Sequence, residues 1–355
     1  MSGANEPLVY PCGEPPAPGS AREVAPGVFW LRMPLPLALD HINLWLVRDG
    51  SGWAAFDSGM HEAETEAAWR QLVGAGGVLE GVPPGRLFVT HMHPDHVGMA
   101  GWLQREFGSD LWMTQTEYLN CRMLAADTGR EAPEEGVSFY RAAGWEHEAL
   151  ERYRERFGGF GRMISPMPQS YRRVQDGEWI RIGGQDWQVL VGTGHSPEHA
   201  CFYNPEQGLL ISGDQVLPRI SSNVSVFPTE PLADPLGDWL QSLERFQRLV
   251  PDDVLVLPAH GEPFRGLHAR LQRMADSQLR ALSRLEGRLQ QGPKRAVDLF
   301  GALFARAIGP DLLSLATGEC LANLNYLLRR GRAVVEADSD GVHWYRAPAP
   351  APTMA

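Results

Sequence analysis

Three histidines and an aspartate crowd into six positions of the segment FVTHMHPDHVG: His91, His93, Asp95 and His96. A short apolar run precedes them and reads as a buried strand, and because side chains alternate along a strand, His91 and His93 face the same side. Pro94 suits the first turn of a helix, which would carry Asp95 and His96. Imidazole nitrogens and carboxylate oxygens are ligands that zinc accepts. The segment therefore predicts a metal site where a strand ends and a helix begins.

Three more residues of the ligand type each follow an apolar run at a glycine-rich or proline-containing turn. They are His195 in VLVGTGHSPEH, Asp214 in LLISGDQ and His260 in VLVLPAHG. Each lies where a strand would deliver a side chain to the edge of a sheet. The alternative interpretation of the first cluster, a helix N-terminus with solvated histidines, is disfavoured by these later residues.

Together these residues resemble the metallo-β-lactamase superfamily, whose motif H-x-H-x-D-H matches residues 91–96 and whose later histidine, aspartate and histidine match the three turns. FDSG, residues 56–59, resembles the family's early D-x-G turn. The resemblance covers about residues 28–265 and implies an α/β fold, an αββα sandwich with metals at one edge of the two sheets. It also implies that Asp57 orients the ligating histidines. His199 is expected to support the site or the fold rather than to bind metal.

Carried over position by position, the resemblance divides the ligands between two zinc ions: His91, His93 and His195 on one, Asp95, His96 and His260 on the other, and Asp214 on both. Iron or manganese would be alternatives to zinc. A water that bridges two such ions forms hydroxide near neutral pH. Asp95 is the expected catalytic residue, because its carboxylate could accept or pass on a proton.

Departures from other branches of the family narrow the resemblance. The oxygen-reducing diiron branch has glutamate where this chain has His93, and true β-lactamases generally lack the bridging carboxylate that Asp214 supplies. Mononuclear iron sulfur dioxygenases do not use the positions of His96 and His260 as a full second site. The chain therefore looks closer to the glyoxalase II, lactonase and ribonuclease-like members.

Changes of pattern divide the chain into segments. Residues 1–27 read as an irregular arm, 28–265 as the catalytic domain, 266–347 as a winged-helix-like region of helices and a closing hairpin, and 348–355 as a tail. Within the catalytic domain, residues 114–173 have helical spacing and many aromatics, and they interrupt the succession of strands. This segment is expected to be a helical insertion.

The insertion suggests where substrate binds. Its aromatic side chains could form an apolar lid over the metals, or they could simply be the core of the insertion's own helices. Tyr171, Arg172 and Arg173 are expected to hold an anionic end of the substrate. His41 opens an early strand and is expected near the metals, facing substrate.

The C-terminal region raises the question of nucleic acid. It resembles the winged-helix tail of the β-lactamase-like 2 group, some of whose members cleave single-stranded RNA, and Arg329, Arg330 and Arg332 could contact phosphates. The net charge of −11 and the absence of an aromatic and basic stacking segment favour another role, namely packing against the catalytic domain or a homodimer contact.

Composition points to a soluble, cytoplasmic protein. The four cysteines are scattered without zinc or redox spacing, the first twenty residues do not read as a signal peptide, and no apolar run approaches the roughly 20 residues needed to span a bilayer. We therefore expect no membrane partner.

The sequence as a whole predicts a dinuclear zinc hydrolase that uses a metal-bridging hydroxide to cleave a small thioester, ester or lactone. The small-molecule acyl substrate is thus the expected partner. One alternative is a ribonuclease-like phosphodiesterase. The other is a non-catalytic winged-helix regulator that binds nucleic acid.

Overall fold

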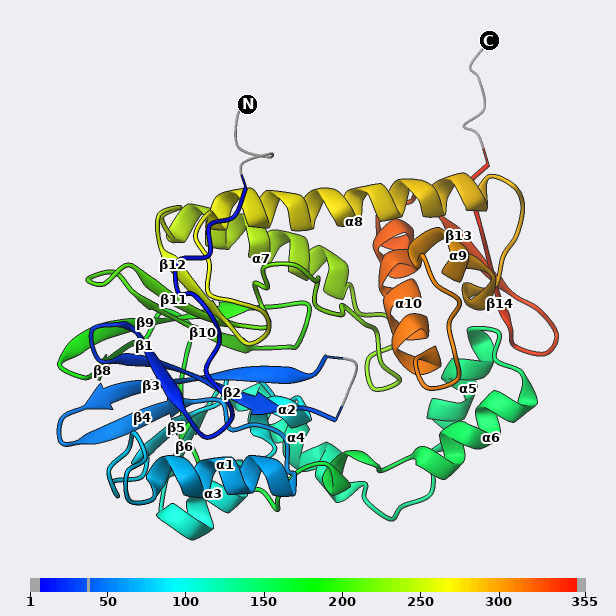
Figure 1. Ribbon diagram of the computed structural model, residues 1–355. Helices are drawn as coiled ribbons and strands as arrows, with labels where there is room; N and C mark the ends of the chain where they lie inside the picture. Colours follow the sequence, from blue (N-terminus) through cyan, green and yellow to red (C-terminus); the bar gives the residue numbers. More distant parts are fainter. Residues whose placement is uncertain (1–6, 37–38, 350–355) are drawn as a thin grey trace. The chain divides into compact units, whose positions relative to one another are not determined.

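The apolar residues of segment 28–56 alternate between two buried faces in the computed structural model. In β2 (Val28–Pro34), Trp30 faces one hydrophobic cluster and Leu31 faces another, and in β3 (His41–Asp49) Trp45 and Leu44 divide in the same way. A strand whose two faces are both buried belongs in the middle layer of a sandwich, because successive side chains point to opposite sides. The structure describes residues 7–36 and 39–349 (Figure 1).

Twelve of the described strands form two sheets. The first sheet has the order β1 (Ala21–Ala25), β2, β3, β4 (Gly52–Phe56), β5 (Arg86–Phe88), β6 (Asp110–Met113), β7 (Arg172–Arg173). The second has the order β12 (Leu255–Pro258), β11 (Leu209–Gly213), β10 (His199–Asn204), β9 (Gln185–Gly192), β8 (Trp179–Ile182). Pairing is parallel from β4 to β7 and between β11 and β12, and antiparallel elsewhere.

The two sheets pack face to face through large aromatic side chains. The ring of Phe56 in β4 lies 4.9 Å from that of Phe202 in β10, and Phe88 in β5 lies 5.3 Å from the same ring. Burying one such side chain contributes on the order of 1.5–3 kcal/mol, so this layer strongly favours the sandwich. The α/β sandwich expected from the resemblance is therefore present.

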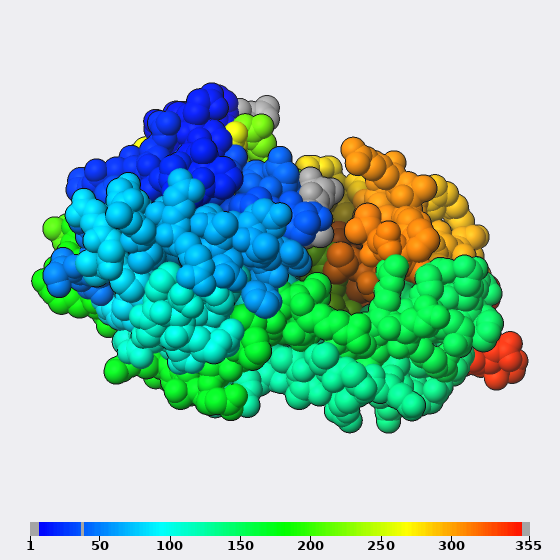
Figure 2. Space-filling model, turned by 60° about the horizontal axis from the view of Figure 1, so that its bottom comes forward, coloured from blue at the N-terminus to red at the C-terminus, as the bar shows by residue number. Residues whose placement is uncertain are grey.

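Helices cover the outer face of the first sheet. Trp69 and Leu72 of α1 (Ala63–Val73) and Leu103 of α3 (Ala100–Phe107) pack into the same cluster as Leu31 and Leu44. Figure 2 shows α1 and α3, in light blue and cyan, at this face. The short helix α2 (Pro94–Val97) precedes α3, and α4 (Gln115–Ala126) and the 3₁₀ turn η1 (Phe160–Arg162) follow it.

The chain divides into two units. The first holds both sheets and comprises Met1–Gly129, Gly158–Ser222 and Glu244–Leu271, whereas the second comprises Arg130–Phe157, Asn223–Leu243 and Gln272–Ala355. The unit boundaries fall inside α7 (Pro235–Leu249) and α8 (Leu267–Leu289), and the domain boundaries predicted from the sequence stay a prediction. Within the first unit, Arg245 of α7 donates a hydrogen bond to the carbonyl of Val191 in β9 at 2.7 Å.

Helices dominate the second unit. Its further elements are α5 (Glu134–Ala142), α6 (His147–Arg156), the 3₁₀ turn η2 (Ala296–Leu299), α9 (Phe300–Leu303), α10 (Leu313–Arg329) and the hairpin of β13 (Val334–Ala337) and β14 (His343–Arg346). Trp145, between α5 and α6, donates a hydrogen bond from Nε1 to Oγ1 of Thr317 in α10 at 2.9 Å. The expected closing hairpin is present, and the winged-helix assignment stays a prediction.

One expected segment differs. The arm predicted over residues 1–27 is not irregular throughout, because Ala21–Ala25 forms β1 and pairs antiparallel with β2. Its sequence AREVA lacks a strong apolar alternation, and the strand forms as an edge that completes the hydrogen bonds of β2. The first six residues of that arm and the last six of the predicted tail lie outside the described residues.

Strand ends in the two sheets determine where the polar side chains meet. The expected ligand residues follow β5, β9, β11 and β12, and Asp57 follows β4. Two glycines allow the backbone to pack closely there. A Cβ on Gly98 would lie 2.4 Å from the Pro94 carbonyl oxygen and 2.6 Å from that of Gly59, and a Cβ on Gly213 would meet the ring of His199 at 2.6 Å.

Candidate metal centre

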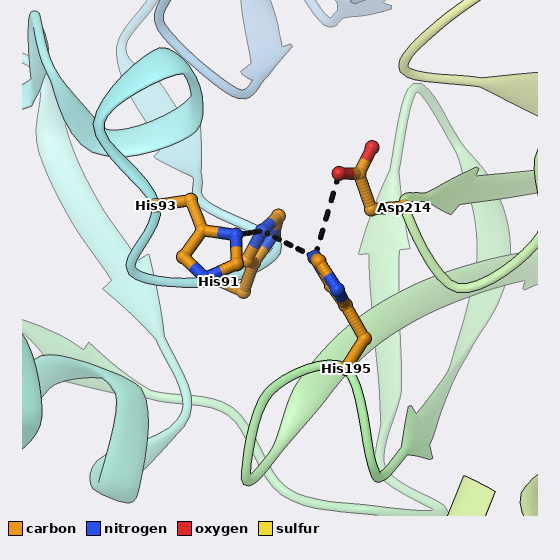
Figure 3. Close-up of side chains that lie close together, drawn as sticks. All are labelled: His91, His93, His195 and Asp214. Atoms are coloured by element: carbon orange, nitrogen blue, oxygen red, sulfur yellow. Dashed lines mark hydrogen bonds and ion pairs between the residues drawn. The ribbon is translucent and has the colours of Figure 1, made fainter. Parts of the chain in front are cut away.

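The first group of ligand-type side chains draws on both sheets (Figure 3). Nε2 of His91 lies 2.9 Å from Nδ1 of His93 and 3.2 Å from Nε2 of His195. Nε2 of His195 lies 3.4 Å from Oδ2 of Asp214. His91 and His93 follow β5 of the first sheet, whereas His195 follows β9 of the second. Four potential donor atoms therefore converge on one point.

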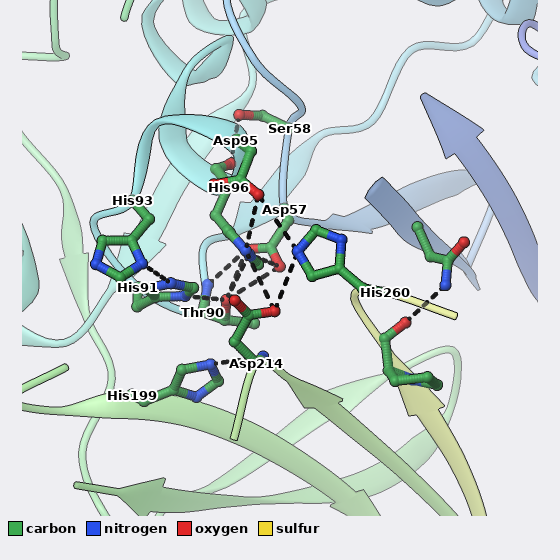
Figure 4. A network of polar contacts seen from close by, with 12 residues as sticks. Asp57, Ser58, Thr90, His91, His93, Asp95, His96, His199, Asp214 and His260 are labelled. Carbon is green, nitrogen blue, oxygen red and sulfur yellow. Dashed lines mark hydrogen bonds and ion pairs between the residues drawn. The ribbon is translucent and has the colours of Figure 1, made fainter. Parts of the chain in front are cut away.

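The second group surrounds the other oxygen of the same aspartate (Figure 4). Oδ1 of Asp214 lies 3.6 Å from Nε2 of His96 and 3.4 Å from Nε2 of His260. Oδ2 of Asp95 lies 3.6 Å and 3.4 Å from the same two nitrogens. Asp214 thus presents one carboxylate oxygen to each group, as expected for a residue that bridges two metal ions.

Hydrogen bonds on the outer side of the rings select which nitrogen faces the centre. Nδ1 of His96 lies 2.8 Å from Oδ2 of Asp57, and Nδ1 of His260 lies 2.8 Å from the carbonyl oxygen of His41. Because these oxygens are acceptors, each Nδ1 carries the proton, and each Nε2 offers its lone pair to the group. Oγ1 of Thr90 lies 3.0 Å from Nδ1 of His91, which directs Nε2 of that ring inward in the same way.

Burial keeps His91 and His93 of the first group uncharged. It lowers the pKa of His91 well below its usual value, and repulsion from neighbouring imidazoles adds to this effect. Burial, together with the nearby His195, lowers the pKa of His93 to about 3. A neutral imidazole is the form that ligates a metal, so these side chains are ready to do so.

The second group has the opposite electrostatics. Burial acts to lower the pKa of His96, but the carboxylates of Asp57, Asp95 and Asp214 outweigh it and raise that pKa well above its usual value. Burial likewise acts to lower the pKa of His260, but the carboxylates of Asp214 and Asp95 outweigh it, so that this pKa is raised. Several carboxylates around two imidazoles create a site that favours positive charge. Protons on the imidazoles provide this charge in the absence of metal, and a bound divalent cation would provide it in their place.

Two buried atoms at the centre support a metal there. Among the described residues, Nε2 of His96 and Oδ1 of Asp214 have no hydrogen-bond partner. Leaving buried polar atoms unpaired is costly, and such atoms call for an occupant. Donors about 2.0–2.2 Å from a tetrahedral zinc ion lie about 3.3–3.6 Å from one another. The separations of 3.4–3.6 Å in the second group fall in this range, so the residues of that group fit a zinc ion.

The two residues expected to support the ligands, Asp57 and His199, contact ligand-type residues in the structure. Asp57 is buried, binds His96 and accepts a hydrogen bond from the main-chain N–H of Thr90 at 2.8 Å. Nε2 of His199 accepts the main-chain N–H of Asp214 at 3.0 Å, and its ring stacks on that of His91 with centroids 4.7 Å apart. His199 therefore fixes the backbone that carries the carboxylate of Asp214.

His41 lies beside the centre, although its contacts differ from those of a substrate-facing residue. Nδ1 lies 2.6 Å from the Asp40 carboxylate, and Nε2 accepts the main-chain N–H of Gly261 at 3.1 Å. Both ring nitrogens are thus engaged, and Nε2 holds the turn that carries His260. A role in substrate binding stays a prediction.

Two of the three residues expected to hold an anionic substrate, Tyr171 and Arg172, have other partners in the structure. Tyr171 stacks on Tyr118 with ring centroids 3.9 Å apart. Arg172 lies 5.3 Å from the ring of Trp112 and 3.8 Å from the carboxylate of Asp110. Arg172 and Arg173 are exposed in β7, so the substrate-binding role of these residues stays a prediction.

Sequence reasoning missed two residues that organise the site. Thr90 contacts Asp57 and the rings of both His91 and His96, and its position directly before the histidine motif was a signal that could have revealed it. Glu117, in α4, is fully buried and binds main-chain groups in two ligand-bearing loops. Nothing in its local sequence distinguishes it from an ordinary acidic residue in the first turn of a helix.

No helix among the described residues is long and apolar enough to cross a membrane.

The comparisons with known proteins agree with this geometry. The family model described as "Metallo-beta-lactamase superfamily" matches residues 37–261, and "Metallo-beta-lactamase-like, C-terminal domain" matches residues 282–348. The crystal structure of a β-lactamase domain protein from Burkholderia ambifaria is 38% identical with a TM-score of 0.87, and the match covers 96% of this chain and 98% of that one.

Two curated relatives are also similar over most of the chain. A probable metallo-hydrolase, YqjP of Bacillus subtilis, is 25% identical over 84% of this chain and 92% of its own length. Acyl-coenzyme A thioesterase MBLAC2 of Gallus gallus is 25% identical over 71% of this chain and 83% of its own length. With its two groups of histidine and aspartate side chains at one edge of a two-sheet sandwich, the chain belongs to the metallo-β-lactamase superfamily of hydrolases.

Proposed function

We propose that the chain is a dinuclear zinc-dependent hydrolase that cleaves a small thioester, ester or lactone. The observation that carries the proposal is the position of Asp214, whose Oδ2 faces His195 and whose Oδ1 faces His96 and His260. Each oxygen of this carboxylate faces a different group of imidazole nitrogens. Such an arrangement suits a pair of cations better than a single one. Iron or manganese would suit the same nitrogen and oxygen donors.

Some of the protein's own side chains would hold the metal ligands in place, and another would transfer a proton. Two bound divalent cations would supply an activated water and polarise the substrate's carbonyl oxygen. Asp57, Thr90 and the His41 carbonyl keep the ligating rings in the required orientation. The Asp95 side chain is 20% exposed, whereas those of His96 and His260 are 0% and 3% exposed. Asp95 is therefore the group in this set best placed to exchange a proton with solvent.

Two features support an acyl substrate over a nucleic acid. The relative named as an acyl-coenzyme A thioesterase covers most of the chain. Arginines that could contact phosphates are already paired within the second unit, because Arg330 binds Asp234 at 2.8 Å and Arg332 binds Glu286 through two bonds of 2.6 and 2.7 Å. A ribonuclease or a nucleic-acid-binding regulator would need these cations released.

We further propose the cytoplasm as the compartment and leave a homodimer as the proposed assembly. All four cysteines are free, and three of them are buried, which suits a reducing environment.

Parallel assays of the purified chain test the function. Metal analysis comes first, followed by turnover of acyl-thioesters, lactones and single-stranded RNA under the same conditions. We expect acyl hydrolysis that His93→Ala abolishes, while His147→Ala, at an exposed position in α6, leaves it unchanged. Cleavage of RNA without any acyl turnover would overturn the proposal in favour of the phosphodiesterase.

A further inference from the structure

Glu117 lies where the ligand-bearing loops of the two sheets meet. The first loop follows β5 and carries His91 and His93, and the second follows β9 and carries His195. These residues come from different sheets, so the first group of ligand-type side chains comes together only if something fixes the separation of the two loops. Glu117 belongs to neither loop, because it lies in the first turn of α4.

Each carboxylate oxygen of Glu117 accepts a hydrogen bond from a different loop. Oε2 accepts the main-chain N–H of Met92 at 2.9 Å, and Met92 is the residue between His91 and His93. Oε1 accepts the main-chain N–H of Glu198 at 2.8 Å, three residues after His195. One side chain therefore ties both loops to the same helix.

The second loop holds the helix in return. Oγ1 of Thr114 donates to the carbonyl oxygen of Glu198, and the main-chain N–H of Thr116 donates to its carboxylate, both at 2.8 Å. These bonds fix the beginning of α4 and leave Glu117 little freedom to move. Glu117 is 0% exposed, and a carboxylate so deeply buried is tolerated only when hydrogen bonds satisfy it.

The second group, which contains Asp95, His96 and His260, is held by other residues. Ser58 donates from both its main-chain N–H and its Oγ to the carbonyl oxygen of His96, while Asp57 binds the ring. The turn at His260 is held by His41. Loss of Glu117 would thus act chiefly on one of the two groups.

We propose that Glu117 is a positioning residue that sets the distance between the loop of His91 and His93 and the loop of His195, and thereby the affinity of that group for its cation. The inference rests on the proposed dinuclear site. Glutamine in place of Glu117 has nearly the same shape but replaces one acceptor oxygen with a donor NH₂, so one of the two amides loses its partner. Hydrogen-bonding partners that support metal ligands typically change affinity by about 10–100-fold.

The test is a titration of the metal-free full-length chain with Co²⁺, followed by its visible absorption, which reports the coordination of each equivalent bound. His93→Ala identifies the step that belongs to the first group, and His260→Ala identifies the step of the second. In Glu117→Gln, we expect the first-group step to weaken by about 10–100-fold while the second stays within about twofold of the wild type. Glu106→Gln, which removes an exposed carboxylate from α3, is the matched control and should bind as the wild type does.

The outcomes separate the two proposals. Suppose that the wild type binds two equivalents of Co²⁺. If Glu117→Gln then weakens both steps equally, or changes neither, the role of Glu117 is overturned and the dinuclear site still stands. A wild type that binds no metal overturns both. If Glu117→Gln fails to fold, Glu117→Asp replaces it, because the shorter side chain keeps the charge but cannot reach both loops, and the same selective weakening is expected.

Discussion

Asp57 accepts a hydrogen bond from Nδ1 of His96 across 2.8 Å, although its own backbone has a φ of 61° that residues other than glycine seldom adopt. Backbone in this region costs roughly 1–3 kcal/mol and persists where the surrounding structure enforces it. Here the unusual turn after β4 directs the carboxylate at a ligand ring. The orientation of the His96 ring in the second group depends on this relationship.

Asp57→Asn is therefore expected to weaken metal binding. Because Oδ1 accepts the Thr90 N–H, the new NH₂ would face Nδ1 of His96 and donate to it, which moves the ring's proton to Nε2 and removes the lone pair. We expect a loss of about 10–100-fold in affinity, measured by competition with a chelator. Asp186→Asn, at an exposed ion pair with Arg181, should be neutral. Unchanged affinity in Asp57→Asn would show that the tautomer of His96 does not matter.

Gly98→Ala is expected to destabilise the first unit by about 1–3 kcal/mol. The added Cβ would lie 2.4 Å and 2.6 Å from two main-chain carbonyl oxygens, which cannot move without displacing α2 and the turn after β4. Urea unfolding of the metal-free chain measures the effect. Gly85→Ala is the control, since nothing lies within 4 Å of its Cβ position. Equal stability of the two variants contradicts the close packing of α2 on the turn.

The pH dependence of stability should carry a contribution from Glu319 in α10. Burial raises the pKa of this carboxyl from 4.5 to about 7, against a hydrogen bond of 3.0 Å from Asn223. The folded state then holds a proton that the unfolded state has lost, so the free energy of unfolding falls as pH rises from about 4.5 to 7.

Glu319→Gln removes this contribution. The free energy of unfolding of the variant, minus that of the wild type, should increase from pH 5 to pH 8 by at most about 3 kcal/mol. Urea unfolding at several pH values measures this difference. Glu336→Gln, at an exposed ion pair with Arg346, should leave the wild-type dependence in place. A parallel dependence in the wild type and Glu319→Gln would mean that Glu319 ionises normally.

Removal of the metals is expected to lower the temperature of unfolding. A ligand that binds only the folded state stabilises it by about 4 kcal/mol when present at about 1,000 times its dissociation constant. The repulsion between the carboxylates of Asp95 and Asp214 also returns when a cation leaves. Differential scanning calorimetry before and after dialysis against a chelator, and again after zinc is restored, measures both changes. An unfolding temperature indifferent to chelation speaks against a structural contribution of the metals.

The sequence predicted which side chains converge at the centre, because each of them follows a strand at a recognisable turn. His195, Asp214 and His260 lie far apart in the chain, yet the sheet order brings their strand ends together, as expected for strands that end at one edge. These features depend on local patterns that short segments carry by themselves.

Other features could not be predicted because tertiary contacts create them. Glu117 becomes a tie between loops only through Met92 and Glu198, which are 25 and 81 residues away in the chain. His41 resembles a free ring beside the metals until Gly261 is seen to donate to it. The strand Ala21–Ala25 forms because β2 offers a free edge, although its own composition favours no strand.

The metal content of the purified chain tests the central claim most directly. Wild-type protein dialysed free of excess zinc should retain two ions per chain by mass spectrometry of the metal, and His260→Ala should retain about one. Asp214→Ala should weaken both sites, because each of its carboxylate oxygens faces a different group. A wild-type chain that takes up no zinc, iron or manganese, or an Asp214→Ala variant that holds two ions as tightly as the wild type, would contradict the account.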